Sequence, residues 1–148
     1  MDHGSVAKDL FTQGYNCAQS VLCAFDDVTG LDRDTSAKIA SSFGGGMGRM
    51  REVCGCVNGA LMVLGMVKGY GDPKASSEKN DHYALVREFM ERFKKDNGSI
   101  ICRELLEGVA VKPGPEAEER TEEYYKKRPC PELVEYAAGV VDEMLEKQ

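Results

Sequence analysis

The sequence has no uninterrupted apolar run long enough to span a membrane. A membrane-spanning helix needs about 18 to 20 such residues. The most apolar stretch, residues 57–67, is broken by Asn58 and is followed by Lys68. Residues 1–5 also lack the basic segment and apolar run that mark a secretory signal. We therefore expect no membrane association and a cytoplasmic location.

Several familiar motifs are missing as well. The sequence contains no C-x-x-C of the thioredoxin type and no C-x-x-C-H for covalent haem. The glycine-rich residues 44–48 lack the Lys-Ser/Thr pair of a Walker loop, and they do not follow a predicted strand. The two histidines, His3 and His82, lie far from every cysteine in the sequence, and we expect both to be exposed. These absences exclude two common redox classes and a nucleotide-binding loop.

Basic residues are too few for a nucleic-acid-binding protein. The chain has 19 Lys and Arg against 25 Asp and Glu, a net charge of −6. The acidic residues crowd the last third, where a phosphate backbone would be repelled. We expect no nucleic acid as a partner, and we expect residues 116–128 to form a solvated helix.

The hydrophobic pattern predicts an all-α fold. No segment shows sustained alternation of apolar and polar residues, whereas apolar residues recur at helical spacing through much of the chain. A chain of 148 residues, 42% of them hydrophobic, is long enough for one domain with a core of its own. We predict a single domain over residues 1–148, a compact bundle of about six helices around a buried central helix that contains glycines. The main predicted helices cover residues 5–13, 17–26, 32–43, 57–67, 78–97 and 131 onward, with shorter ones at 100–106 and 116–128.

Four of the six cysteines fall at predicted helix starts. In a reducing compartment such residues do not indicate structural disulfides, so they are core thiols, metal ligands or redox groups. Free backbone amides and the helix dipole stabilise an anion at a helix N-terminus, which favours the thiolate, the form that ligates metals and attacks disulfides. We expect these four side chains to converge on one site and to favour the thiolate form: Cys17, Cys54, Cys102 and Cys130.

The other two cysteines are different. Cys23 lies six residues beyond Cys17, about 240° around the same helix and about 9 Å along it, so the two cannot pair and Cys23 is expected in the core. Cys56 could assist Cys54 or simply pack. Gly44, Gly45, Gly46 and Arg49 precede Cys54 closely enough to belong to its site, with tight backbone packing favoured for the glycines and an anion-binding turn as the alternative.

Several segments resemble one known family. The sequence is similar to the C_GCAxxG_C_C family of redox-active proteins over nearly its whole length, because it contains GYNCAQ (14–19), FGGGMGRM (43–50), EVCG (52–55), SIICREL (99–105) and Cys130. One residue departs from the family pattern, which usually has alanine where this chain has Cys56. The resemblance implies redox chemistry at the cysteines but does not specify a reaction.

Three functions fit four such cysteines, and we rank them as follows. The first is electron transfer through an iron–sulfur cluster held by Cys17, Cys54, Cys102 and Cys130. The second is metal-free dithiol/disulfide exchange, for example by Cys54 with Cys17 or Cys102. The third is a structural zinc site in an interaction module. The first two imply a redox partner protein, and the apolar stripe of the last helix would serve either an internal seam or a homodimer.

Overall fold

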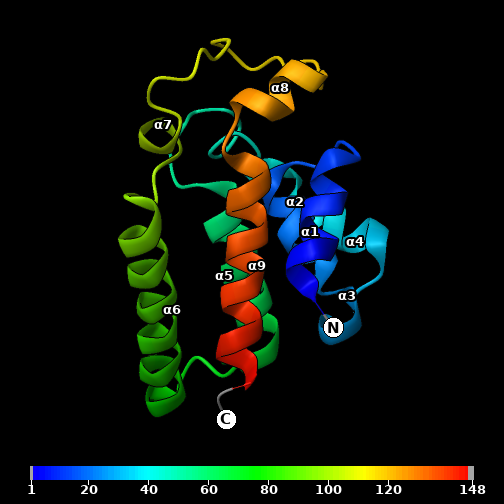
Figure 1. Cartoon of the computed structure of the whole chain (residues 1–148). Coiled ribbons are helices and arrows are strands. Elements are labelled where there is room, and N and C mark those ends of the chain that lie inside the picture. The colour runs from blue at the N-terminus through cyan, green and yellow to red at the C-terminus, as the bar shows by residue number, and fades with distance from the viewer. Residues whose placement is uncertain (1, 147–148) are drawn as a thin grey trace.

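The computed structural model describes residues 2–146, and within this range the chain forms helices and no β-strand (Figure 1). The expected all-α class is confirmed, but the expected number of about six helices is too low. The described residues form nine α-helices and one 3₁₀ helix: α1 (His3–Thr12), α2 (Cys17–Ala24), α3 (Asp26–Thr29), α4 (Arg33–Ala40), η1 (Ser41–Phe43), α5 (Gly55–Lys68), α6 (Ser76–Asn97), α7 (Cys102–Leu105), α8 (Glu122–Lys127) and α9 (Cys130–Glu146).

The extra helices are short pieces that periodicity does not resolve. The helix expected over 17–26 breaks at Phe25, whose backbone leaves helical geometry (φ −104°, ψ 19°) before α3 begins. The helix expected over 32–43 ends at Ala40 and continues only as η1. The solvated helix expected over 116–128 is reduced to α8, because the Thr121 side chain caps it by accepting from Tyr124 N at 3.1 Å.

Two predicted helix boundaries hold and one does not. Asn16 caps α2 in a capping box, in which its side chain accepts from Gln19 N at 2.8 Å and the Gln19 side chain accepts from Asn16 N at 3.0 Å. Gly98 ends α6 in the left-handed conformation (φ 93°). The helix expected over 100–106, however, starts only at Cys102, as α7, and the Ser99 hydroxyl accepts from Ile101 N at 2.9 Å instead of capping it.

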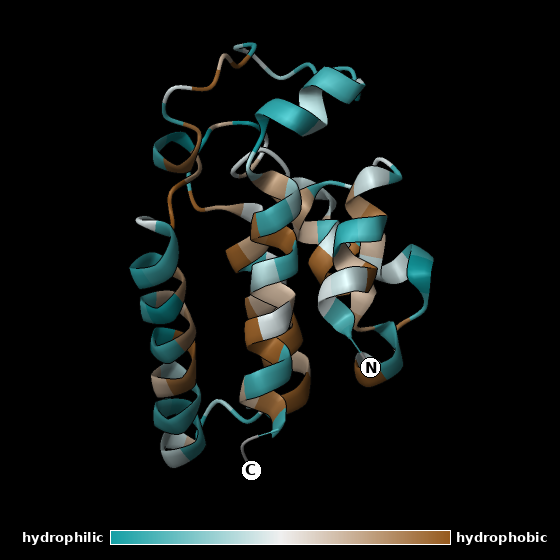
Figure 2. Cartoon of the chain, viewed as in Figure 1, coloured by the Kyte–Doolittle hydropathy of each residue, from teal (hydrophilic) through white to brown (hydrophobic). Residues whose placement is uncertain are grey.

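The core lies where α1, α2, α5 and α9 pack together, and α6 packs against α5 and α9. Figure 2 shows hydrophobic residues concentrated where these helices meet, while α8 and most of α6 are hydrophilic. The apolar stripe of α9 is buried inside the chain, so it forms an internal seam: Leu133, Val134, Ala137, Val140, Val141 and Met144. None of the helices in residues 2–146 has the length and apolar character that crossing a membrane requires.

The predicted glycine-containing helix is α5. It contacts α2, α9 and α6, and most of its first ten residues are buried. A Cβ at Gly59 would lie 2.7 Å from the Ala18 carbonyl oxygen, so glycine permits the close approach of α5 to α2. The expectation that this helix is apolar and buried nearly all round is only partly met, because Met66 is 52% exposed.

His3 is buried rather than exposed. Its Nδ1 lies 2.6 Å from Asp142 Oδ1, and its Nε2 lies 3.0 Å from Asp27 Oδ1. The imidazole also stacks on Phe25, with ring centroids 4.1 Å apart. The carboxylates that satisfy this histidine come from α3 and α9, which explains why the sequence around His3 gave no indication of its burial.

The path of the chain brings several helix N-termini to one end of the bundle. In Figure 1 the chain ascends through α1 and α6, whereas α2, α5 and α9 each begin at the upper end and descend. The short α7 lies at this same end, and α8 with the segment before it crosses over the top. The four cysteines predicted at helix starts are thereby carried to a common place.

Candidate functional site

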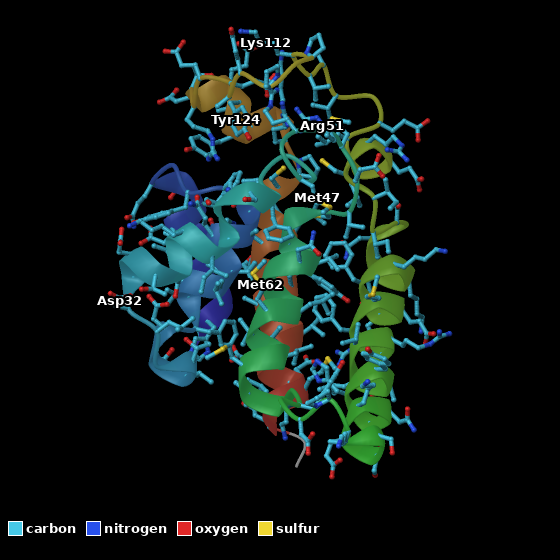
Figure 3. The ribbon with its side chains drawn as sticks, turned by 180° about the vertical axis from the view of Figure 1, so that it is seen from behind. Asp32, Met47, Arg51, Met62, Lys112 and Tyr124 are labelled. Atoms are coloured by element: carbon cyan, nitrogen blue, oxygen red, sulfur yellow. The ribbon has the colours of Figure 1, made fainter. Side chains whose placement is uncertain are left out.

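The four cysteines predicted to converge line a single cavity of about 50 Å³. Each stands at the beginning of a helix: Cys17 is the first residue of α2, Cys54 is the N-cap of α5, Cys102 is the first residue of α7, and Cys130 is the first residue of α9. Figure 3 labels Arg51 and Tyr124, which also line this cavity, at the same end of the molecule. The predicted convergence is therefore confirmed.

A short backbone bridge sets Cys54 beside Cys102. Val53 and Ile101 form an isolated antiparallel β-bridge. Next to it, Cys54 N donates to the Ile100 carbonyl at 2.7 Å and Cys102 N donates to the Glu52 carbonyl at 2.6 Å. Two segments about 50 residues apart in the sequence are thus fixed side by side, and each continues directly into a helix, α5 after its N-cap Cys54 and α7 from its first residue Cys102.

The predicted site glycines are contact points with these cysteine-bearing segments. A Cβ added at Gly46 would lie 2.7 Å from Cys102 Cβ, and one added at Gly44 would lie 2.7 Å from the side-chain nitrogen of Asn16, the cap of α2. Gly45 and Gly46 line the cysteine cavity. Tight packing, the favoured interpretation for this stretch, agrees with these distances.

The backbone after η1 adopts a run of left-handed residues that the sequence did not reveal. Met47, Arg49 and Arg51 have φ values of 70°, 62° and 61°, and Gly45, Gly46 and Gly48 are left-handed as well. Each non-glycine residue in this region costs about 1 to 2 kcal/mol. Hydrogen bonds such as those from Arg51 N to the Gly45 carbonyl (3.1 Å) and from Arg49 N to the Gly44 carbonyl (3.0 Å) hold the loop in place. This strained loop carries Arg51 into the wall of the cavity.

Cys17 is the thiol that its surroundings favour as a thiolate. The Cys130 and Cys56 side chains hydrogen-bond to its sulfur, and Arg120 and Arg128 add positive potential. Together these lower the pKa of Cys17 well below its ordinary value. The same contacts raise the pKa of Cys130, mainly through its hydrogen bond to Cys17, while burial and then its bonds to Cys17 and Cys54 raise the pKa of Cys56.

The expectation of four sulfurs favouring the thiolate form is therefore wrong for two of them. The hydrogen bond to Cys17 raises the pKa of Cys130, and burial raises the pKa of Cys102 although Arg51 Nη1 lies 3.8 Å from its sulfur. A helix N-terminus alone does not outweigh the loss of hydration inside the cavity. Cys17 is thus the site thiol whose pKa is lowered, and Cys130 and Cys56 are the neighbouring side chains that hydrogen-bond to it.

The two remaining cysteines, Cys23 and Cys56, differ in their relation to the site. Cys23 is 1% exposed, lies in the hydrophobic core, and has its pKa raised to about 11, first by burial and then by Asp26. Its expected exclusion from the site agrees with this placement. Cys56, whose role the sequence left open, interacts with both Cys17 and Cys54, but it is fully buried and does not line the cavity.

Three site residues were missed because they lie in the stretch interpreted as a solvated helix. Arg120 donates to the carbonyl of Phe11 (3.0 Å) and to that of Tyr15 (3.1 Å). Arg128 is buried and pairs with Glu118. The centroid of the Tyr124 ring lies 5.0 Å from the guanidinium carbon of Arg120 and 4.8 Å from that of Arg128. Burial raises the pKa of Tyr124 to about 12.

A signal for these residues exists in the sequence, but it is weak. Arg120 lies among five glutamates, Arg128 follows two lysines, and two adjacent tyrosines lie between the two arginines. Arginine stacked on aromatic rings is a common stabilising arrangement. Without the fold, nothing indicates that the stretch folds over the cysteine cavity.

The donor atoms suit a metal in kind but not in arrangement. Four thiols around one cavity are the usual donors for iron–sulfur clusters and structural zinc. Yet residues 2–146 contain no group of three or more His, Cys, Asp or Glu side chains placed to hold a metal ion. All six cysteines are free thiols in this structure.

Comparison with known proteins gives one match. Residues 15–144 match the model of the family described as "Putative redox-active protein (C_GCAxxG_C_C)". No curated protein matches the chain, and no solved structure does. The match spans all four cysteines of the cavity and the glycine-rich loop.

Proposed function

The chain belongs to the C_GCAxxG_C_C family of redox-active proteins, and we propose that it is a dithiol/disulfide oxidoreductase in which Cys17 attacks and Cys130 resolves. The observations that carry the proposal are that Cys17 and Cys130 line the same cavity and that the interaction with Cys130 is the largest cause lowering the pKa of Cys17. A thiolate next to a protonated thiol is the pair of species that the two halves of such a reaction need.

The reaction proceeds in two exchanges. The Cys17 thiolate attacks one sulfur of a substrate disulfide, forms a mixed disulfide and releases the other half as a thiolate, which takes up a proton. Cys130 then loses its proton, attacks the Cys17 sulfur, forms the Cys17–Cys130 disulfide and releases the second half of the substrate as a thiol. The substrate gains two electrons and the protein dithiol loses two. A second dithiol, as external reductant, returns the protein to its starting state.

Access favours Cys130 over Cys56 as the resolving thiol. Both sulfurs hydrogen-bond to Cys17. Cys130 lines the cavity through which a substrate would reach Cys17, whereas Cys56 does not line it and has no exposed surface. Arg128, two residues before Cys130, is buried near both sulfurs and would stabilise the thiolate that forms on Cys130.

Trapping tests these roles. Reduced protein is mixed with bis(2-hydroxyethyl) disulfide, and the products are identified by mass spectrometry. We expect the unchanged protein to form a Cys17–Cys130 disulfide, Cys130→Ala to stop at a mixed disulfide on Cys17, and Cys17→Ala to form neither. Cys23→Ala is the matched control and behaves as the unchanged protein. Mixed disulfide on another cysteine, or an intramolecular disulfide closing in Cys130→Ala, would contradict the assigned roles.

An iron–sulfur cluster is the second candidate, because all four expected ligands line one cavity. The side chains as they are arranged do not form a metal-binding group, so metal binding would require them to move. Anaerobic purification followed by iron, sulfide and zinc analysis separates the candidates. Brown protein containing iron and sulfide supports the cluster, colourless protein with zinc supports a structural site, and colourless protein without metal supports the dithiol mechanism.

A further inference from the structure

A second, larger cavity adjoins the cysteine cavity. Its volume is about 370 Å³, within the range typical of small-molecule sites. The two cavities share part of their walls: Asn16, Gly45, Arg51, Arg120, Tyr124 and Arg128. A molecule bound in the larger cavity, called here the arginine cleft, would therefore lie next to the route to Cys17.

The charge of the arginine cleft is opposite to that of the protein. The chain has a net charge of −6, yet four guanidinium groups and one carboxylate, Glu118, are the ionised side chains among the described residues that line the cleft. Glu118 pairs with Arg128 and lies 4.0 Å from Arg49. The positive charges of Arg51 and Arg120 are not balanced by a carboxylate within the cleft wall.

The arginines are held in place mainly by neutral partners. Arg49 donates to the carbonyls of Lys112 (2.7 Å), Gly114 (2.9 Å) and Glu116. Arg120 likewise donates to two backbone carbonyls of the α1–α2 region. Bonds to neutral carbonyls fix a guanidinium without cancelling its charge, so the positive potential of the cleft persists.

The arginines are also close enough to repel one another. Burial, and then the charge of Arg51, lowers the pKa of Arg49. The pKa of Arg128 is lowered by burial and, to a lesser extent, by the charges of Arg51 and Arg49. An anion placed among them would relieve this repulsion. Guanidinium groups bind carboxylates well because their paired N–H groups match the two carboxylate oxygens.

We propose that the arginine cleft binds the carboxylate groups of the substrate, and that the substrate is a small disulfide bearing carboxylates. This inference rests on the proposed exchange reaction at Cys17. A carboxylate-bearing disulfide would be repelled by the Cys17 thiolate and by the acidic surface, and the cleft supplies the local attraction that overcomes this repulsion. Arg51 and Arg120 both line the two cavities without a carboxylate partner in the cleft. We assign the specificity to Arg51, because its guanidinium donates to the sulfur of Cys102 at 3.8 Å, whereas Arg120 donates to the backbone carbonyls of Phe11 and Tyr15.

Alkylation by a matched pair of reagents tests the cleft without requiring exchange activity. Iodoacetate carries a negative charge and iodoacetamide does not, and their rates at Cys17 are followed by mass spectrometry on reduced protein. The unfolded protein gives the intrinsic ratio of the two rates. We expect the ratio of iodoacetate to iodoacetamide to be about tenfold higher in the folded protein, and to fall with added salt.

Three variants locate the effect. Arg51→Gln is expected to remove most of the tenfold preference, and Arg51→Lys, which keeps the charge, to restore the larger part of it. Arg87→Gln removes the same charge from an exposed position on α6 and is the matched control, in which the ratio stays as in the unchanged protein. A folded ratio equal to the unfolded one, or an equal loss in Arg87→Gln, overturns the proposal.

Disulfide reduction then separates the two proposals. The reduced protein is given 3,3′-dithiodipropionate, bis(2-hydroxyethyl) disulfide or cystamine, which are anionic, neutral and cationic. We expect rates in that order, with the anionic compound about tenfold ahead of the neutral one. Similar rates for all three overturn the cleft while leaving the exchange reaction in place. A preference for iodoacetate with no disulfide reduced overturns the exchange reaction while the anion site stands.

Discussion

The two ends of α2 carry one cysteine each, in opposite surroundings. At the N-terminal end, Cys17 accepts hydrogen bonds from two thiols and lies near two arginines, and its pKa is lowered. At the other end, Cys23 lies in the apolar core near Asp26, and its pKa is raised to about 11. Two residues of the same type, six positions apart on one helix, are thus tuned in opposite directions.

The contrast shows what makes a thiol reactive in this molecule. Burial by itself disfavours the thiolate, as it does at Cys23 and Cys102. At Cys17, hydrogen-bond donors and cations from several parts of the chain outweigh burial and lower the pKa. They are Cys56 from α5, Cys130 from α9, and the arginines on either side of α8, Arg120 and Arg128. The helix N-terminus supplies a position for the site, and the tertiary contacts supply its chemistry.

The largest expected effect is on the reaction itself. Cys17→Ala should lower the rate of disulfide reduction at least about a hundredfold, because it removes the attacking sulfur. Cys23→Ala should keep the rate within about twofold, since Cys23 does not line the cavity. Rates measured with bis(2-hydroxyethyl) disulfide check both variants. A similar loss of rate in the two variants would show that Cys17 and Cys23 do not differ in function.

The next effect concerns the strained loop at the Cys17 end. Gly46→Ala would place a Cβ 2.7 Å from Cys102 Cβ and 2.8 Å from Arg51 Cα at a φ of 74°. We expect it to lower the free energy of unfolding by about 3 kcal/mol, through crowding plus the left-handed backbone. Gly48→Ala has a similar φ of 59° but open space, and should cost about 1 kcal/mol. Urea denaturation of both variants measures the difference, and equal costs would show that crowding contributes nothing.

A smaller effect is expected between α2 and α5. A Cβ at Gly59 would lie 2.7 Å from the carbonyl oxygen of Ala18, the residue after Cys17. Gly59→Ala should therefore destabilise the protein by about 2 kcal/mol despite its better helix propensity. Gly65→Ala, on the same helix with nothing within 4 Å, should stabilise it by about 0.5 to 1 kcal/mol. Thermal unfolding should move in opposite directions for the two variants, and a stabilised Gly59→Ala would refute the close contact.

The smallest expected effect tests Cys23 through pH. Because the folded state holds the proton of Cys23 up to about pH 11 while the unfolded state releases it near the ordinary pKa, stability falls as pH rises between these values. At pH 9.5 this amounts to about 1 kcal/mol, and Cys23→Ala abolishes it. Urea denaturation at pH 7 and pH 9.5 should show the variant losing less stability than the unchanged protein. If the difference in free energy of unfolding between the two proteins is the same at pH 7 and pH 9.5, the pKa of Cys23 is not raised by folding.

Local sequence was a good guide wherever a structure depends on near neighbours. The helix start after Asn16 and the helix end at Gly98 were predicted correctly, because each depends on residues adjacent in the sequence. The helix boundary at Ser99 was not, because the β-bridge of Val53 with Ile101 holds that segment extended. Likewise, the carbonyl of Glu116, at the start of the stretch expected to be helical, accepts from Arg49, which lies 67 positions earlier.

The sequence by itself determined the all-α class and most helix positions, and it placed four cysteines at helix starts, since these follow from apolar spacing and from capping within one turn. Only the tertiary structure decided that Cys17 is the favoured thiolate, that Cys130 is its neighbour, and that arginines from an acidic stretch line the adjoining cleft. The physical reason is that a thiol's ionisation depends on burial and on charges within a few ångströms, and those charges come from residues up to about 110 positions away in the chain.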